Sequence, residues 1–238
     1  MSANFFSSAV PLSRLAAAEN SVHVAALLAA SGGFLDAFTY LGHGGVFANA
    51  MTANVVLLAV AAGTGDWRQS LRHLPPIVAF LAGVAAAQMF QLRRVRVAVR
   101  SPAIACLTAE MLFLLAGGWF PKDFPDVPLV LGISFLAALQ SSAFRRVGEW
   151  VYNSTMTTGS LRAFGEAAFR SVFIREDVAA PRKMEAFGFV CLAFAEGATL
   201  GAWCTWRMHN QALWVVDLLL LGAWIPLLAA WVHTRFAG

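Results

Sequence analysis

Charged side chains are scarce in this sequence. Asp, Glu, Lys and Arg make up 13% of its 238 residues, about half the share found in soluble domains. The sequence is also 59% hydrophobic, with a mean hydropathy of +0.66. One soluble core cannot bury so much apolar surface, so the expected solvent is the lipid bilayer. We therefore predict an all-α integral membrane protein.

Cysteine and catalytic motifs are also lacking. The three cysteines, Cys106, Cys191 and Cys204, stand singly in apolar stretches and match neither CxxC nor zinc spacing. No HExxH, GxSxG or phosphate-loop motif occurs, and the few histidines stand mostly near the ends of apolar stretches. We expect no metal, no cofactor and no enzymatic activity. The start of the chain lacks the basic and apolar regions of a signal peptide.

A net charge of +4 and a pI near 9.4 could indicate a nucleic-acid partner. In a membrane protein, however, Lys and Arg collect in cytoplasmic loops, and that explanation is simpler. The expected partners are the lipid bilayer and a small-molecule solute, and no nucleic acid. The oligomeric state stays open, a homo-oligomer included.

Six apolar stretches are long enough to cross about 30 Å of hydrocarbon as helices: 22–42, 74–92, 102–120, 127–144, 184–206 and 211–232. Two further stretches, 46–63 and 151–161, are shorter or more polar. The sequence thus predicts five segments: a flexible cytoplasmic N-terminus (1–20), a first repeat (21–120), a connecting loop (121–127), a second repeat (128–233) and a C-terminal tail (234–238).

The two repeats are predicted from three matches in the same order. At an offset of 106, Thr52-Ala53-Asn54 falls on Thr158-Gly159-Ser160. At an offset of 114, Phe80 and Gly83 fall on Phe194 and Gly197, and at an offset of 107, Glu110 falls on Asp217. Apolar sequences align easily by chance, but the shared order favours a duplicated unit.

The basic residues favour one topology. If the two short stretches dip into the membrane and return, thirteen of the 17 Lys and Arg lie on one side, and only Arg68, Arg72, Lys122 and Arg207 on the other. This bias obeys the positive-inside rule. We predict six transmembrane helices plus two short broken or re-entrant helices, built as an inverted internal repeat in the bacterial inner membrane with both termini cytoplasmic. Eight crossings with a parallel repeat is the alternative.

The two short stretches contain polar residues at membrane depth. In "GHGGVFANAMTAN" (42–54), the glycines allow turns, and Asn49 and Thr52 can cap a half-helix beginning near Met51. The free amides of such an end attract an anion or a carbonyl dipole. The predicted substrate-binding residues are Asn49, Thr52, Asn54, Gln140, Thr155, Thr158 and Gly159. The alternative is that these side chains only bond neighbouring helices.

The stretch "GGFLDAFTYLGHGGVFANAMTANVVLL" (32–58) resembles the YoaK-type family of bacterial multi-spanning membrane proteins. That family carries a Phe-x-x-x-Met-Thr-Gly-Asn motif, and Gln140, "FRR" (144–146) and "TTGSL" (157–161) are similar to its second motif. Here Ala53 replaces the family's Gly, which puts a sharp bend at that position in doubt. The resemblance implies the membrane architecture and no particular substrate.

Ionisable residues inside the predicted spans are the last candidates, because charges at membrane depth are rare and usually functional. The predicted proton- or ion-coupling residues are Asp36, Glu110, Glu196 and Asp217. A backbone-capped Asp36 and structural anchoring of Glu110 and Asp217 to arginines are the alternatives. Glu196 is a candidate partner for Arg145 or Arg146. These two arginines are predicted anion contacts or, more simply, positive-inside anchors.

These features favour a secondary transporter of a small solute, with its site at the repeat interface. Whether the solute is anionic and whether protons couple to its movement stay open. A non-catalytic membrane scaffold is the main alternative, and a membrane-embedded enzyme ranks third.

Overall fold

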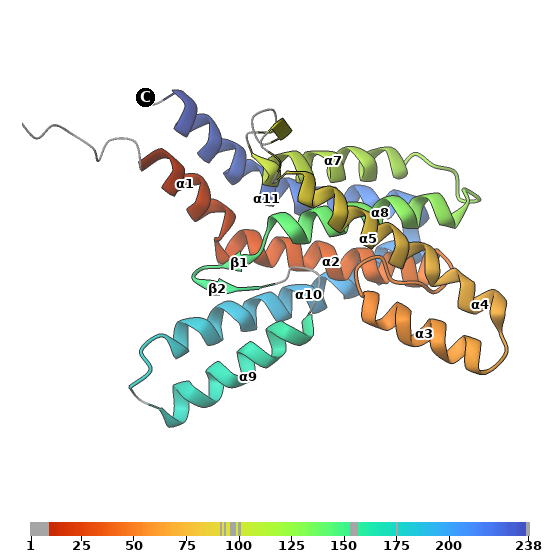
Figure 1. The fold of residues 1–238 in the computed structure, drawn as a ribbon, viewed down its shortest axis with the longest axis horizontal. Helices are drawn as coiled ribbons and strands as arrows, with labels where there is room; N and C mark the ends of the chain where they lie inside the picture. Colours follow the sequence, from red (N-terminus) through yellow and green to blue (C-terminus); the bar gives the residue numbers. More distant parts are fainter. Residues whose placement is uncertain are drawn as a thin grey trace, which may run out of the picture.

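A computed structural model describes residues 10–90, 92, 94–95, 99, 101–152, 157–174 and 176–236. Nearly all of the described chain is helical (Figure 1). The helices of the first half are α1 (Val10–Glu19), α2 (Val22–Gly42), α3 (Met51–Gly63), α4 (Trp67–Arg72), α5 (Leu74–Met89) and α7 (Pro102–Gly117). The second half holds α8 (Asp126–Ala143), the hairpin of β1 (Arg146–Val147) and β2 (Trp150–Val151), α9 (Thr157–Phe173), α10 (Ala180–Met208), η1 (His209–Gln211) and α11 (Ala212–Phe236).

Four helical stretches are long and apolar enough to cross a membrane: Val22–Gly42, Trp67–Met89, Asp126–Ala143 and Ala180–Arg235. The last stretch has 56 residues and contains both α10 and α11, which η1 separates. Met51–Gly63 and Pro102–Gly117 are shorter apolar helices. The length and hydrophobicity of these helices therefore confirm the prediction of an all-α membrane protein.

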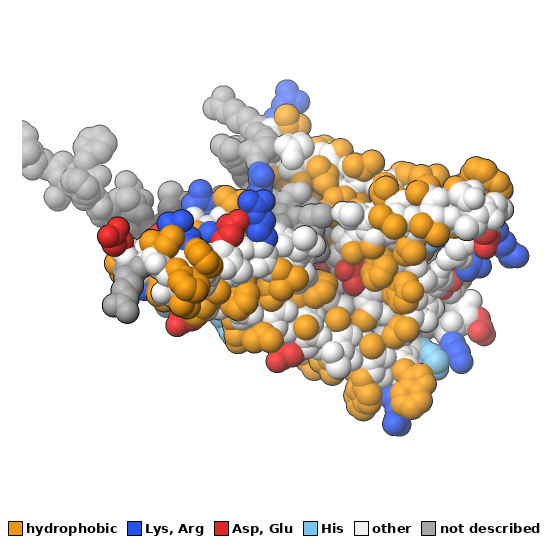
Figure 2. All heavy atoms as spheres, turned by 90° about the horizontal axis from the view of Figure 1, so that it is seen from below, with side chains coloured by type: hydrophobic (Ala, Val, Ile, Leu, Met, Phe, Trp, Pro, Cys, Tyr) orange, Lys and Arg blue, Asp and Glu red, His pale blue; other side chains and the backbone are white. Residues whose placement is uncertain are grey.

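The long helices lie roughly along the long axis of the molecule (Figure 1). Two helices differ, because α3 and α9 each begin near the middle of the molecule and run outwards to opposite ends. At 13 residues, α3 measures roughly 20 Å, too short for a hydrocarbon layer of about 30 Å. Charged side chains gather towards the two ends, and hydrophobic side chains cover much of the flank between them (Figure 2).

Small residues bring the long helices together. A Cβ at Gly197 or Gly201 of α10 would collide with the backbone of α2, at Ala30 and Phe34 respectively. A Cβ at Gly83 of α5 would collide with the backbone of α8 at Phe135. These three glycines therefore allow close packing of the helix backbones.

Two helices extend beyond the apolar stretches seen in the sequence. Residues 10–19, within the expected N-terminal segment 1–20, form α1, whose Ala18 packs against the core that includes α11. α9 begins within the second short stretch (151–161) and continues to Phe173, and its charged side chains are exposed.

Candidate functional site

Side chains of α2 hold the segment that leads into α3. The Asp36 carboxylate accepts the backbone N–H of Asn49 at 2.7 Å and that of Ala50 at 3.4 Å. The hydroxyl of Thr39 accepts the N–H of Ala48 at 3.1 Å. Asp36 and Thr39 are both buried. Asp36 therefore satisfies backbone donors at the start of α3, which agrees with the backbone-capped alternative for this residue.

The two asparagines of the first motif also bond to the backbone. The Asn49 side chain donates to the carbonyl of Gly32 at 3.1 Å. The Asn54 side chain accepts the N–H of Phe47 at 3.0 Å and donates to its carbonyl at 2.6 Å. A ring nitrogen of His73 lies 3.3 Å from the same Asn54 oxygen. These bonds shape the extended segment that brings the chain back towards the middle of the bundle.

The predicted capping of α3 by Asn49 and Thr52 is wrong. Ala50 is the N-cap residue, and its methyl side chain cannot accept a hydrogen bond. The carboxylate of Asp36 accepts the amides of Asn49 and Ala50, which directly precede the helix. Asn49 and Asn54 are buried and turned towards the backbone, and the structure does not place them on a cavity wall. Of Asn49, Thr52 and Asn54, it is Thr52 that lines the cavity described next.

A cavity of about 890 Å³, here called the central cavity, lies where the two motifs meet. Its walls come from α2, the segment before α3, the starts of α3 and α9, and α10. The polar side chains on its walls are Asp36, Tyr40, Thr52, Thr157 and Thr158. The remaining lining is largely apolar. The cavity thus joins Asp36 to the N-terminal turns of both short helices, which are more than a hundred residues apart in sequence.

A second cavity of about 430 Å³ lies beside the start of α9. Arg145, Thr158 and Gly159 line it, together with Ser141 and Tyr152. Thr158 lines both cavities, so the second cavity adjoins the central one. The structure therefore brings together three of the predicted site residues. Arg146 is exposed in β1 and is not on this wall.

Glu110 and Gln140 form a buried pair between α7 and α8. The Gln140 amide donates to the Glu110 carboxylate at 2.8 Å, and both residues are buried. Asp217 of α11 lies close enough to interact electrostatically with Glu110. Both carboxylate oxygens of Asp217 are shielded from solvent and have no hydrogen-bond partner among the described residues. Gln140 therefore faces Glu110 rather than the cavity beside Arg145.

Two predicted site residues remain apart from these groups. Glu196 is exposed on α10 and, in the described part of the chain, forms no ion pair with Arg145 or Arg146. The predicted partnership fails because the arginines follow the end of α8, whereas Glu196 lies in the interior of the 29-residue α10. Thr155 lies outside the described residues.

One polar contact was missed from the sequence. A ring nitrogen of His43 lies 2.8 Å from the Asp126 carboxylate, and the two residues border a cavity of about 240 Å³ that Arg72 also lines. Asp126 stands at the first position of α8, 83 residues from His43. No spacing in the sequence could have paired them.

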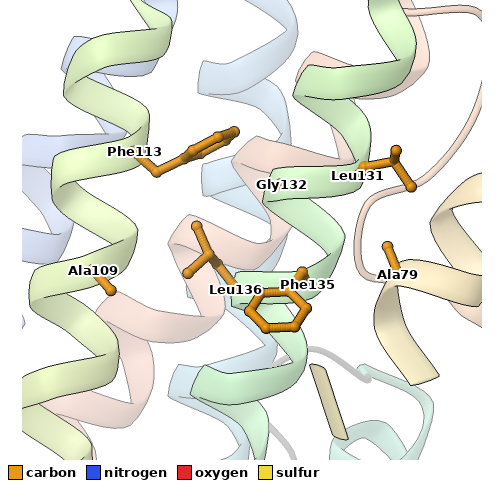
Figure 3. A pocket seen from close by; sticks show the side chains of 7 residues that line it. All are labelled: Ala79, Ala109, Phe113, Leu131, Gly132, Phe135 and Leu136. Atoms are coloured by element: carbon orange, nitrogen blue, oxygen red, sulfur yellow. The ribbon is translucent and has the colours of Figure 1, made fainter. Parts of the chain in front are cut away.

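An apolar groove of about 500 Å³ lies over α5, α7 and α8. Figure 3 shows the ring of Phe113 beside Gly132, with Leu131, Phe135 and Leu136 along α8. No side chain on its lining can form a hydrogen bond. This groove is therefore not a candidate site for a polar solute.

Comparisons with known proteins give two matches. The model of the family described as "Protein of unknown function (DUF1275)" matches residues 24–225. The "UPF0700 transmembrane protein YoaK" of Bacillus subtilis (strain 168) is 26% identical over 200 residues, which cover 82% of this chain and 89% of that protein. No solved structure matches. The resemblance predicted from the paired motifs is confirmed.

Proposed function

This chain belongs to the DUF1275 family of membrane proteins, whose function is unknown, and we propose that it is a secondary transporter of a small solute. The proposed binding site is the central cavity. The observation that carries this proposal is that the starts of α3 and α9 and the carboxylate of Asp36 line the same cavity of about 890 Å³. Broken helices whose ends meet at a central site are typical of secondary transporters.

The pairing of the helices supports an inverted repeat. α2 packs on α10, as α8 packs on α5. α11 packs on α2, as α7 packs on α8, and α7 and α11 contact each other. Exchanging the two halves leaves this set of contacts unchanged, and α3 and α9 run to opposite ends (Figure 1). A two-fold relation within the membrane plane accounts for both facts.

The proposed topology has six crossing helices, with α3 and α9 re-entering from opposite sides. The end that carries α1, the β-hairpin and the C-terminus (Figure 1) is the proposed cytoplasmic end. Arg14, Arg145, Arg146 and Arg170 belong to segments of this end, whereas Arg68 in α4 and Lys122 in the loop after α7 belong to the other. This segregation supports both termini on the cytoplasmic side of the inner membrane.

Glu110 and Asp217 are the proposed proton-coupling pair. Two carboxylates shielded from water and near each other in an apolar bundle cannot both remain charged at low cost, so protonation of at least one of them is favourable. Gln140 holds Glu110 in place. Coupling by this pair would act on the central cavity through α8 and α11, both of which contact α2.

A flux assay tests the transport proposal. The protein is reconstituted into vesicles, and proton movement is followed after addition of pooled small metabolites, with Asp36→Asn, Thr52→Val and Glu110→Gln as variants. Transport predicts a flux that the two cavity variants reduce and that Glu110→Gln uncouples from protons. A flux that all three variants leave unchanged would contradict the proposed site, and the absence of any protein-dependent flux would agree with a non-catalytic scaffold.

Cysteine labelling tests the topology. Thr64, which follows α3, and Glu176, which precedes α10, are both exposed. Thr64→Cys and Glu176→Cys are made in a background without Cys106, Cys191 and Cys204 and labelled with an impermeant maleimide. The re-entrant topology expects labelling from opposite sides of the membrane. Labelling of both positions from one side would favour eight crossings.

A further inference from the structure

The lining of the central cavity carries a single type of formal charge. Asp36 is the one acidic residue on it, and no Lys, Arg or His from the described chain joins the lining. Arg145 belongs to the neighbouring cavity, and Arg72 to the cavity beside His43. A small anion entering the central cavity would thus meet a carboxylate and no basic side chain.

Asp36 is the only formal charge among the described residues of this lining, and two helix ends lie on the same cavity. Its carboxylate accepts the amides of Asn49 and Ala50, which directly precede α3, and an α-helix N-terminus carries a partial positive charge of about half an elementary charge. The start of α9 adds its own partial positive charge through the other motif, at Thr157 and Thr158. The wall around Asp36 is consequently the negative part of the cavity.

Aromatic rings extend this negative wall. Tyr40 lies one helical turn after Asp36 on α2, and its ring stacks on Phe47 with centroids 4.9 Å apart. Tyr40, Phe47 and Phe194 all line the central cavity. The faces of aromatic rings attract cations, most strongly where water is excluded. The rest of the lining is largely apolar and suits a hydrocarbon body.

We propose that the central cavity binds an organic cation: an ammonium or similar group placed against Asp36, Tyr40 and Phe47, with an apolar body filling the remaining volume. This inference rests on the proposed transport function and specifies its substrate class. Asp36 thereby has two roles, because one of its oxygens accepts the amides of Asn49 and Ala50 while its charge faces the ligand. The cavity volume suits a molecule the size of a substituted aromatic amine.

Binding of two matched probes to the purified full-length protein tests the proposal. Radiolabelled benzyltrimethylammonium is the cation, and benzenesulfonate is an anion of similar size. Equilibrium dialysis in detergent is expected to show saturable binding of the cation and at least about tenfold weaker binding of the anion. Equal or tighter binding of the anion would overturn the cation assignment and leave the transporter proposal standing.

Three variants locate the cation within the molecule. Asp36→Asn keeps an oxygen acceptor for the amides of Asn49 and Ala50 but removes the charge, and it is expected to weaken cation binding by about tenfold or more. Tyr40→Leu is expected to weaken it about three- to tenfold. Glu196→Gln removes an exposed acid from α10, which also lines the cavity, and should leave binding unchanged. Thermal unfolding of each variant verifies that it is folded.

The outcomes separate the two proposals. Full cation affinity in a folded Asp36→Asn variant, or no saturable cation binding to the parent protein, would refute the cation site. Cation binding that depends on Asp36 without any flux of the probe into vesicles would support the site and refute transport.

Discussion

Both motif regions place the start of a helix at the central cavity, but different contacts hold the two regions in place. In the first, α3 is short and apolar, and buried Asp36, Thr39 and Asn49 bind the segment before it to α2, while Asn54 of α3 bonds the same segment at Phe47. In the second, α9 is longer and amphipathic, and a β-hairpin precedes it. Here the N–H of Gly148 donates to the carbonyl of Asn20 at 2.6 Å, and the hydroxyl of Tyr152 donates to the carbonyl of Ala25 at 2.8 Å.

The difference concerns where backbone polar groups find partners. The first motif enters with no secondary structure of its own, so side chains must satisfy its amides at membrane depth. The hairpin of the second motif satisfies part of its backbone through strand pairing between Arg146–Val147 and Trp150–Val151. We therefore expect the first motif to depend much more strongly on single side chains than the second.

The largest expected effect is that of Asp36→Leu. This change leaves the N–H groups of Asn49 and Ala50 without an acceptor in an apolar region, at a cost on the order of 3 kcal/mol. Thermal unfolding in detergent should show a severe loss of stability or no folded protein, whereas Asp36→Asn should unfold near the parent temperature. Equal stability of the two variants would show that Asp36 does not hold α3.

Asn54→Leu is expected to have the next largest effect. It removes both bonds to the backbone of Phe47 and the contact with His73, and it should cost roughly 2 kcal/mol. Thr64→Ala is a suitable control, because the exposed Thr64 hydroxyl bonds only to carbonyls of its own helix. If both variants unfold at the same temperature, the hydrogen bonds between Asn54 and Phe47 contribute nothing to the stability of the fold.

Tyr152→Phe should cost less, about 1 kcal/mol, because it removes one hydrogen bond to Ala25 and keeps the ring in its packing site. The unfolding temperature is measured under the conditions used for Asn54→Leu. A larger loss for Tyr152→Phe than for Asn54→Leu would reverse the comparison between the two motifs.

The smallest effect concerns the loop between α9 and α10. The hydrogen bond from the Arg170 guanidinium, at 2.6 Å, lowers the pKa of Asp177 below its ordinary value of 3.8. A lowered folded-state pKa stabilises the fold at pH values above the ordinary pKa of the carboxyl group. This stabilisation is lost as the pH falls through the lowered pKa. Asp177→Asn should therefore speed amide exchange of this loop slightly at neutral pH.

The effect of Asp177→Asn should also shrink in high salt, because the ion pair is on the surface. Amide hydrogen exchange of residues 176–180 at two salt concentrations measures this. A slowing of exchange in the variant at neutral pH and low salt would be the opposite of the expected sign.

Much of the architecture could be predicted from the sequence. Hydrophobic length alone located the long helices, because crossing a bilayer requires a minimum apolar run. The start of α3 at Met51 agrees with the expected half-helix, and Gly44 and Gly45 adopt the positive φ angles of 81° and 74° expected of a glycine turn. The matching of Thr52 with Thr158 anticipated two residues that line one cavity.

The roles of individual polar residues could not be predicted in the same way. Asn49, Thr52 and Asn54 lie within six residues of one another, yet only Thr52 lines the central cavity, because the local path of the backbone decides which side chain turns inwards. Gln140 was predicted to bind the substrate but donates a hydrogen bond to Glu110, 30 residues earlier.

The sequence by itself determined that this protein is an all-α membrane protein with two polar interruptions, because hydrophobicity and its gaps are local properties of the chain. Only the tertiary structure decided that Asp36 accepts the amides just before α3 and borders the cavity, that Glu110 meets Gln140, and that His43 meets Asp126. Such pairings depend on which helices become neighbours, and packing between distant segments sets that.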